Sequence, residues 1–230
     1  MNIPSCCASA EWLTPVPLAH GVGVYAAISK EMGHDLVFPG SETFYTKFDS
    51  FTSSMIHAQF CEWAALEPKA ANQAFNVTNG DTESWQNLWP RVARRFGMKV
   101  KPDQFAGKSE LSGETVLDKT PISVLEKEIG LQGRTQQSKL EQRINLVKWS
   151  QQDEVKKAWD RLAEREGLQK DAFEKATWAF LDFILGRNFD CVISMSKARE
   201  FGWTGYADTW KTLSDVFGEL EAARVLPKLH

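Results

Sequence analysis

Only two short segments of this chain have the pattern of a buried β-strand, and this limits what it can fold into. Residues 36–38 (Leu-Val-Phe) are apolar and end at Pro39-Gly40, while residues 74–78 (Ala-Phe-Asn-Val-Thr) precede the turn sequence Asn79-Gly80-Asp81. Each segment occurs in a strand-then-helix order, which is typical of an α/β fold. Two strands do not make a viable parallel sheet, because such sheets have several strands and are covered on both faces. The two predicted strands therefore need partner strands, and the sequence shows no further segment with the pattern of one.

Most of the remaining chain is predicted to be helical, from apolar residues at intervals of three and four and from capping residues. We expect helices over residues 18–32, 52–67, 85–96, 121–129, 150–166, 173–185, 192–201 and 208–220. Thr52 or Ser53 can cap the second of these, and Ser150 the fifth. Pro90 contradicts the third, since an interior proline removes a backbone hydrogen bond, so that helix either starts late or kinks. Residues 1–17 and 98–118 are expected to be irregular. After residue 118 the chain is expected to be helical throughout.

The composition excludes several classes of function. The 230 residues carry 27 Lys and Arg against 30 Asp and Glu, a net charge of −3, so no basic excess points to nucleic acid or an anionic membrane. No run approaches the roughly 18–20 apolar residues that span a bilayer, and the first residues lack a signal-peptide pattern. The four cysteines have neither metal-ligand spacing nor the density of a disulfide framework. We therefore expect a cytoplasmic protein with reduced thiols and no metal site.

Residues 21–26 spell the dinucleotide fingerprint G-x-G-x-x-G/A, as Gly-Val-Gly-Val-Tyr-Ala. That motif requires a strand and a tight turn before it, so that the glycine amides meet the pyrophosphate. Pro15 and Pro17 stand where such a strand would need amide donors. We therefore interpret these residues as small side chains in a tightly packed helix, with a nonstandard dinucleotide site around Gly21 and Gly23 as the alternative.

Other catalytic motifs are absent from the sequence. It contains no phosphate-binding loop, zinc-protease motif, C-x-x-C pair or G-x-S-x-G elbow. No tyrosine is followed by a lysine four residues later, since Tyr25 meets Lys30, and Tyr206 meets Lys211, at five. The four histidines are scattered, and His57 is expected to be solvated rather than to act as a general base. We predict no catalytic and no cofactor-binding residue within the chain.

One predicted helix concentrates large side chains that could line a pocket. Phe180, Phe183, Ile184 and Arg187 are spaced so that they share one helix face, and Trp178 precedes them. Core packing explains a stripe of this kind. The functional alternative is the wall of an apolar pocket whose rim carries one positive charge.

Several stretches, in order, resemble the PRISE group, which comprises the extended short-chain dehydrogenases that are progesterone 5β-reductase-like and iridoid synthase-like. They span about residues 18–230 and are GVYAAISKEMG, LVFPG, WAALEPKAANQAFN, AFNVTNGDTESWQNLWPRVARRFG, WAFLDFILGRNFDCVISMSKAREFGWTGYADTW and VLPK. The excursion near residues 98–150 is closer to fungal than to plant members. The resemblance implies the C-terminal half of a Rossmann-type α/β enzyme. Residues 18–97 would belong to its α/β domain and residues 98–230 to a mostly helical substrate domain, with residues 1–17 unmatched.

The resemblance also implies an activity, NADPH-dependent reduction of a C=C bond conjugated to a carbonyl, in fungal secondary-metabolite biosynthesis. In this family hydride passes from the nicotinamide to the β-carbon, while a tyrosine hydroxyl, assisted by a lysine, stabilises the enolate oxygen. The nucleotide-binding glycines, the tyrosine and the lysine belong to an N-terminal half that has no counterpart here. We therefore expect an N-terminally truncated chain.

The resemblance carries over a substrate-binding set. Phe180 matches an aromatic residue that lines the family's substrate pocket, and Phe183, Ile184 and Arg187 follow on the same helix face, with Trp178 as a weaker member. The expected partner is a small apolar organic substrate with an activated double bond, not nucleic acid or a membrane, and a dimer is allowed. The alternative is a non-catalytic fragment or partner that docks on another Rossmann subunit through exposed strand edges.

Overall fold

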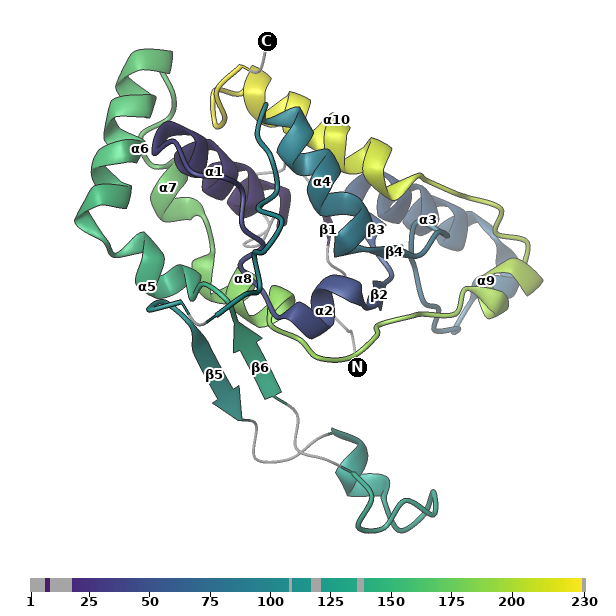
Figure 1. Cartoon of the computed structure of the whole chain (residues 1–230). Helices are drawn as coiled ribbons and strands as arrows, with labels where there is room; N and C mark the ends of the chain where they lie inside the picture. The colour runs from purple at the N-terminus through teal and green to yellow at the C-terminus, as the bar shows by residue number, and fades with distance from the viewer. Residues whose placement is uncertain (1–6, 9–17, 108, 117–120, 136–138, 229–230) are drawn as a thin grey trace.

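The computed structural model describes residues 7–8, 18–107, 109–116, 121–135 and 139–228, which form a helical body with one projecting hairpin (Figure 1). The longer helices are α1 (Leu18–Glu31), α3 (Ser54–Leu66), α4 (Trp85–Arg95), α6 (Asp153–Glu166), α8 (Trp178–Leu185) and α10 (Thr209–Ala222). The shorter ones are α2 (Glu42–Thr46), α5 (Leu146–Ser150), α7 (Ala172–Lys175) and α9 (Ser196–Glu200), with 3-10 turns η1 (Pro68–Ala70) and η2 (Pro121–Leu125). Among the described helices, none has the length and apolar character needed to cross a bilayer.

Helix α1 lies at the centre of the main core. It runs from Leu18 to Glu31 as predicted, and Gly33 follows it in the left-handed conformation at φ 72°. All residues from Leu18 to Ser29 are buried, because α6, α8 and α10 pack around the helix. The buried cluster includes residues on both sides of position 97, so the two predicted regions share one core.

Helix α4 contributes the largest side chains of this core. Trp85, Leu88, Trp89 and Val92 are buried on one face, as their spacing predicted. The helix begins at Trp85 and continues to Arg95 with Pro90 inside it. The possibility of a late start at Pro90 is therefore wrong.

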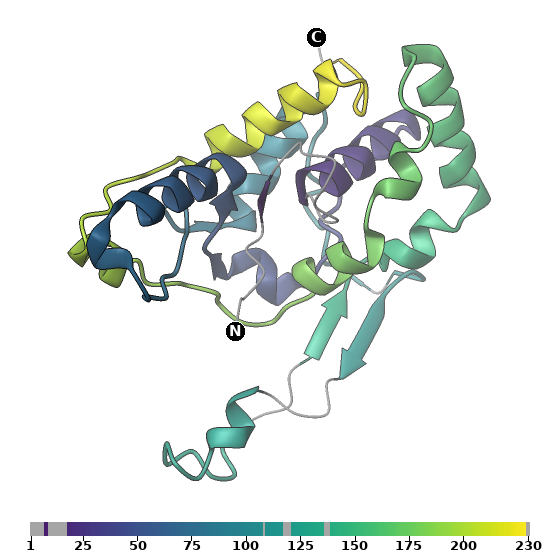
Figure 2. The ribbon, with the colours of Figure 1, turned by 180° about the vertical axis from the view of Figure 1, so that it is seen from behind.

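A smaller cluster lies between α3 and α9. Ile56 and Phe60 of α3 pack with Met195, Ala198 and Trp203. The hydroxyl of Ser53 accepts a hydrogen bond from the amide of Ile56, so Ser53 is the cap of α3. In both views α3 and α9 lie at the end of the molecule opposite α5 and α6 (Figures 1 and 2).

The described strands are short and form three separate pairs. Strand β1 (Cys7–Ala8) is parallel to β3 (Thr52–Ser53), and β2 (Phe48–Asp49) is antiparallel to β4 (Glu83–Ser84). Strands β5 (Gly113–Val116) and β6 (Lys139–Gln142) form the antiparallel hairpin.

Both predicted strands are wrong. Residues 36–38 make a single bridge, between Leu36 and Val100, and residues 74–78 are not in a strand. The Gln104 side-chain oxygen accepts the hydrogen bond from the amide of Phe38, so this extended backbone is satisfied without a partner strand. An apolar run predicts that a segment is buried, but it does not say which neighbour takes its hydrogen bonds.

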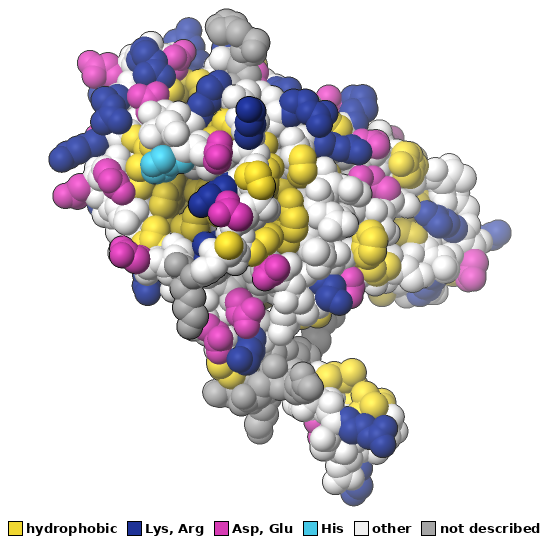
Figure 3. Space-filling model, viewed as in Figure 1, with side chains coloured by type: hydrophobic (Ala, Val, Ile, Leu, Met, Phe, Trp, Pro, Cys, Tyr) yellow, Lys and Arg dark blue, Asp and Glu magenta, His cyan; other side chains and the backbone are white. Residues whose placement is uncertain are grey.

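The expectation of helix throughout the chain after residue 118 is also wrong. Strands β5 and β6 carry η2 away from the body, as both ribbon views show (Figures 1 and 2). Ile122, Val124, Leu125 and Ile129 are exposed on this projecting segment, and hydrophobic side chains are visible on it (Figure 3).

Three further helix boundaries differ from the prediction. Ser150 ends α5 instead of capping α6, which begins at Asp153. The single helix predicted over residues 173–185 is divided into α7 and α8, and of residues 192–201 only Ser196–Glu200 are helical. The last helix starts as predicted, since the Asp208 carboxylate accepts a hydrogen bond from the amide of Lys211.

Candidate functional site

Helix α8 carries four of the five residues predicted to bind substrate, and it presents them to different surroundings. Phe183 is 48% exposed, whereas Phe180 is partly buried against the main core. Ile184 is buried inside that core, and Trp178 packs its ring against Trp149, with 5.4 Å between the ring centroids. Of these four side chains, Phe183 is therefore the most open to a molecule that approaches from solvent, and Phe180 is partly accessible.

Arg187 is not a free cation at a pocket rim. Its guanidinium lies 2.6 Å from the carboxylate of Asp49, and both side chains are buried, at 9% and 3% exposure. The guanidinium also lies 4.5 Å from the centre of the Phe44 ring, and its Nε donates to the carbonyl of Ile184. The charge that the sequence suggested for substrate binding is thus already neutralised within the protein.

Two opposing effects act on the pKa of the buried acid Asp49. Burial raises the pKa of Asp49, while the nearby positive charge of Arg187 and its hydrogen bond lower it. The amide of Ser50 donates to the same carboxylate. The ion pair joins β2 to the segment that follows α8, so it fixes how the end of α8 sits on the body.

A second buried acid holds α8 from its other side. The Asp182 carboxylate accepts hydrogen bonds from the amides of Leu146 at 2.7 Å and Val147 at 3.2 Å, at the start of α5. Burial raises the pKa of Asp182 to about 6, although these two donors oppose the shift. Sequence reasoning missed this residue, and the available signal was a single charge inside the otherwise apolar run WAFLDFIL.

Exposed aromatic residues lie close to the Asp49–Arg187 pair. Phe48 is 50% exposed and Phe189 46% exposed, and the amide of Phe48 donates to the Asp190 carboxylate. The Phe189 ring centre is 5.8 Å from the Arg187 guanidinium. Neither phenylalanine was predicted, although each precedes an aspartate in the sequence.

The dinucleotide fingerprint is packed inside the main core. A Cβ atom on Gly21 would lie 2.2 Å from Leu181, and one on Gly23 would lie 2.6 Å from Leu226. Both glycines lie within α1, not at a turn between a strand and a helix. They are small so that neighbouring side chains can approach the helix, as predicted, and the alternative of a nonstandard dinucleotide site at Gly21 and Gly23 is wrong.

No tyrosine of the described chain is arranged as the family's catalytic tyrosine would be. Tyr25 is buried, donates to the carbonyl of Val37 at 2.9 Å, and has its pKa raised by burial. Tyr45 is partly buried and has no lysine four positions later. Tyr206 is 62% exposed, with Lys211 five residues later. The described residues therefore do not fit NADPH together with its tyrosine–lysine pair.

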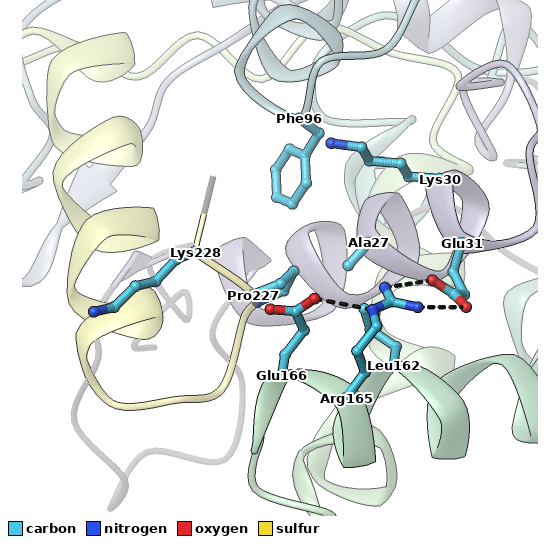
Figure 4. Close-up of a pocket in the computed structure, with 9 residues that line it drawn as sticks. All are labelled: Ala27, Lys30, Glu31, Phe96, Leu162, Arg165, Glu166, Pro227 and Lys228. Carbon is cyan, nitrogen blue, oxygen red and sulfur yellow. Dashed lines mark hydrogen bonds and ion pairs between the residues drawn. The ribbon is translucent and has the colours of Figure 1, made fainter. Parts of the chain in front are cut away.

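A cavity of about 390 Å³ lies between α1, α6 and the segment after α10 (Figure 4). The two carboxylates that line it are both held by Arg165, which pairs with Glu31 at 2.7 Å and with Glu166 at 3.0 Å. These contacts lower the pKa of Glu31 and raise that of Arg165. The cavity is lined by none of the five predicted substrate residues.

No family model matches this chain, whereas individual proteins do. An uncharacterized protein of Schizosaccharomyces pombe is 39% identical over 91% of the chain and 52% of its own length. The short chain dehydrogenase gsfE of Penicillium aethiopicum is 29% identical over 90% of the chain and 48% of its own length. A 3-oxo-Delta(4,5)-steroid 5-beta-reductase of Arabidopsis thaliana is 27% identical over 93% and 46%. The chain spans about half the length of these relatives.

The chain is thus similar, over about 90% of its length, to short-chain dehydrogenases of the PRISE-like group. Its fold is accordingly of the α/β type found in that family, with mostly helical content and few short strands. Two of the relatives are named as a dehydrogenase and a reductase, which is the functional class that the resemblance implied.

Proposed function

We propose that this chain supplies the substrate-facing part of a PRISE-like reductase that reduces a C=C bond conjugated to a carbonyl. The observation that carries the proposal is Phe183, exposed on a helix that Asp182 and Arg187 hold from two sides. One relative is named for a 3-oxo-Delta(4,5) steroid, whose double bond is of this kind. NADPH would be the hydride donor in such a reaction, and its binding groups would come from outside the described residues.

Each residue of the predicted set has a distinct role in this proposal. Phe183 and Phe180 contact the apolar body of the substrate and exclude water from it. Ile184 and Trp178 are buried in the core and so fix the position of α8. Arg187 positions the end of α8 through Asp49 and leaves no charge for the substrate, so the surface suits a neutral apolar molecule.

The decisive experiment separates substrate contact from hydride transfer. The chain is purified alone and together with the part of the Schizosaccharomyces pombe relative that it does not match, and NADPH oxidation is followed with a cyclic enone. We expect no NADPH binding by the chain alone and turnover in the mixture. In the mixture, Phe183→Ala should lower kcat/KM by a factor of about ten, which corresponds to about 1.4 kcal/mol. Leu66→Ala is the matched control, since Leu66 is 75% exposed on α3, and it should change nothing.

A second function is favoured by the strand pairing. Strand β1 is parallel to β3 in a pair of two strands, and parallel strands normally belong to larger sheets. The chain could therefore act as a non-catalytic partner that docks on a Rossmann subunit and extends its sheet. Co-purification with a full-length family member, without turnover in the mixed assay, would favour this function over the first.

The setting that we propose is the cytoplasm of a fungus, in secondary-metabolite biosynthesis. The relative from Penicillium aethiopicum supports a fungal type of enzyme. Localisation of a fluorescent fusion and metabolite profiling of a deletion strain test these two points.

A further inference from the structure

The outer face of α3 carries a cysteine and a histidine that the proposed function does not use. Cys61 and His57 are both exposed and are separated by one helical turn. The Cys61 Sγ lies 4.0 Å from the His57 Nε2. Residues four positions apart share a helix face, so the backbone holds the two side chains next to each other.

A thiolate and an imidazole are the donors that soft and borderline metal ions prefer. Their separation helps to choose the ion. From Zn–S and Zn–N bond lengths of about 2.3 and 2.0 Å, tetrahedral zinc would hold its two donors roughly 3.5 Å apart. The observed 4.0 Å is wider and corresponds to a more open angle at the metal. Monovalent copper accepts two donors in a nearly linear arrangement.

The number of available protein ligands also favours monovalent copper over zinc. Structural zinc requires four ligands, and within the described ranges no group of three or more His, Cys, Asp or Glu residues could hold a metal ion. A two-coordinate ion needs no third protein ligand.

We propose that Cys61 and His57 form a two-coordinate site for monovalent copper on the outer face of α3. On binding, the Cys61 thiol loses its proton to solvent and the sulfur binds the metal, while neutral His57 binds through Nε2. The copper remains monovalent, so no electron is transferred. Cys191, another free cysteine, has no histidine four positions away, and its thiol donates a hydrogen bond to the Asp49 carboxylate.

The test uses the full chain with Cys6, Cys7 and Cys191 changed to serine, so that Cys61 is the sole thiol. Cu(I) is supplied anaerobically as its acetonitrile complex and is partitioned against bicinchoninate, whose absorbance reports the copper it retains. We expect one copper per chain. Cys61→Ser should abolish binding, and His57→Gln should weaken it at least tenfold.

His34→Gln is the matched control, because His34 is an exposed histidine outside α3, and it should bind copper like the parent. Circular dichroism of every variant checks that the helices are retained. Equal affinity of His57→Gln and the parent would overturn the proposal, since the thiol would then bind alone. Retention of one copper by Cys61→Ser would overturn it as well.

Discussion

Replacing Arg187 by methionine tests whether this residue is structural or faces the substrate. The substitution Arg187→Met removes the charge but keeps an unbranched apolar side chain against Phe44. Asp49 then remains buried at 3% side-chain exposure without its partner. Breaking a buried pair in this way costs about 3–5 kcal/mol in the free energy of unfolding.

The compensating double variant gives the reasoning its control. In Asp49→Leu with Arg187→Met no unpaired charge remains, and replacing a buried pair by apolar groups is often close to neutral. We expect this double variant to be within about 2 kcal/mol of the parent, with the loss of hydrogen bonds to Ser50 and Ile184 accounting for the difference. Each single variant should be less stable than the double.

Urea unfolding followed by tryptophan fluorescence measures these values, because the chain has nine tryptophans. In Arg187→Met the carboxyl of Asp49 loses its stabilising cation, so its pKa rises further above the usual value than burial alone already places it. Folding then favours the protonated acid, and the destabilisation shrinks as the pH is lowered. A loss below about 1 kcal/mol at pH 7.5, or a loss that does not depend on pH, would refute the assignment of a buried structural pair.

Three further predictions follow from named contacts. Burial raises the pKa of Asp182 from 3.8 to about 6, so folding favours its protonated form. The free energy of unfolding, measured by urea titration at each pH, should therefore fall by at most about 3 kcal/mol as the pH rises from 4 to 6. The variant Asp182→Asn should lack this pH dependence. Gly21→Ala should destabilise the chain by about 1–3 kcal/mol in thermal unfolding, since its Cβ meets Leu181, whereas Gly218→Ala, in a roomier part of α10, should stabilise it by about 0.5–1 kcal/mol. In the mixed NADPH assay, Phe180→Ala should lower kcat/KM by a cost of about 1–3 kcal/mol, and an unchanged rate would place Phe180 in the core alone.

Helix α8 illustrates how much the spacing of residues can predict. Intervals of three and four residues predicted that Phe180, Phe183 and Ile184 share a helix, and they do. The same intervals could not say that Ile184 is buried while Phe183 is exposed, because that depends on which elements pack against α8. The ion pair of Arg187 was equally hidden, since its partner Asp49 lies 138 positions away in the chain.

The sequence by itself determined the local features: the ends of α1 at Leu18 and near Gly33, the start of α3 with a cap at Thr52 or Ser53, and the cap Asp208. Capping and helix periodicity act between residues close together in the chain or on one helix face, so the pattern of residues reveals them. Strand partners, the hairpin and the burial of Arg187 and Asp182 were decided only by the tertiary structure. These depend on hydrogen bonds and charges from distant segments, and no local pattern specifies which segment will arrive.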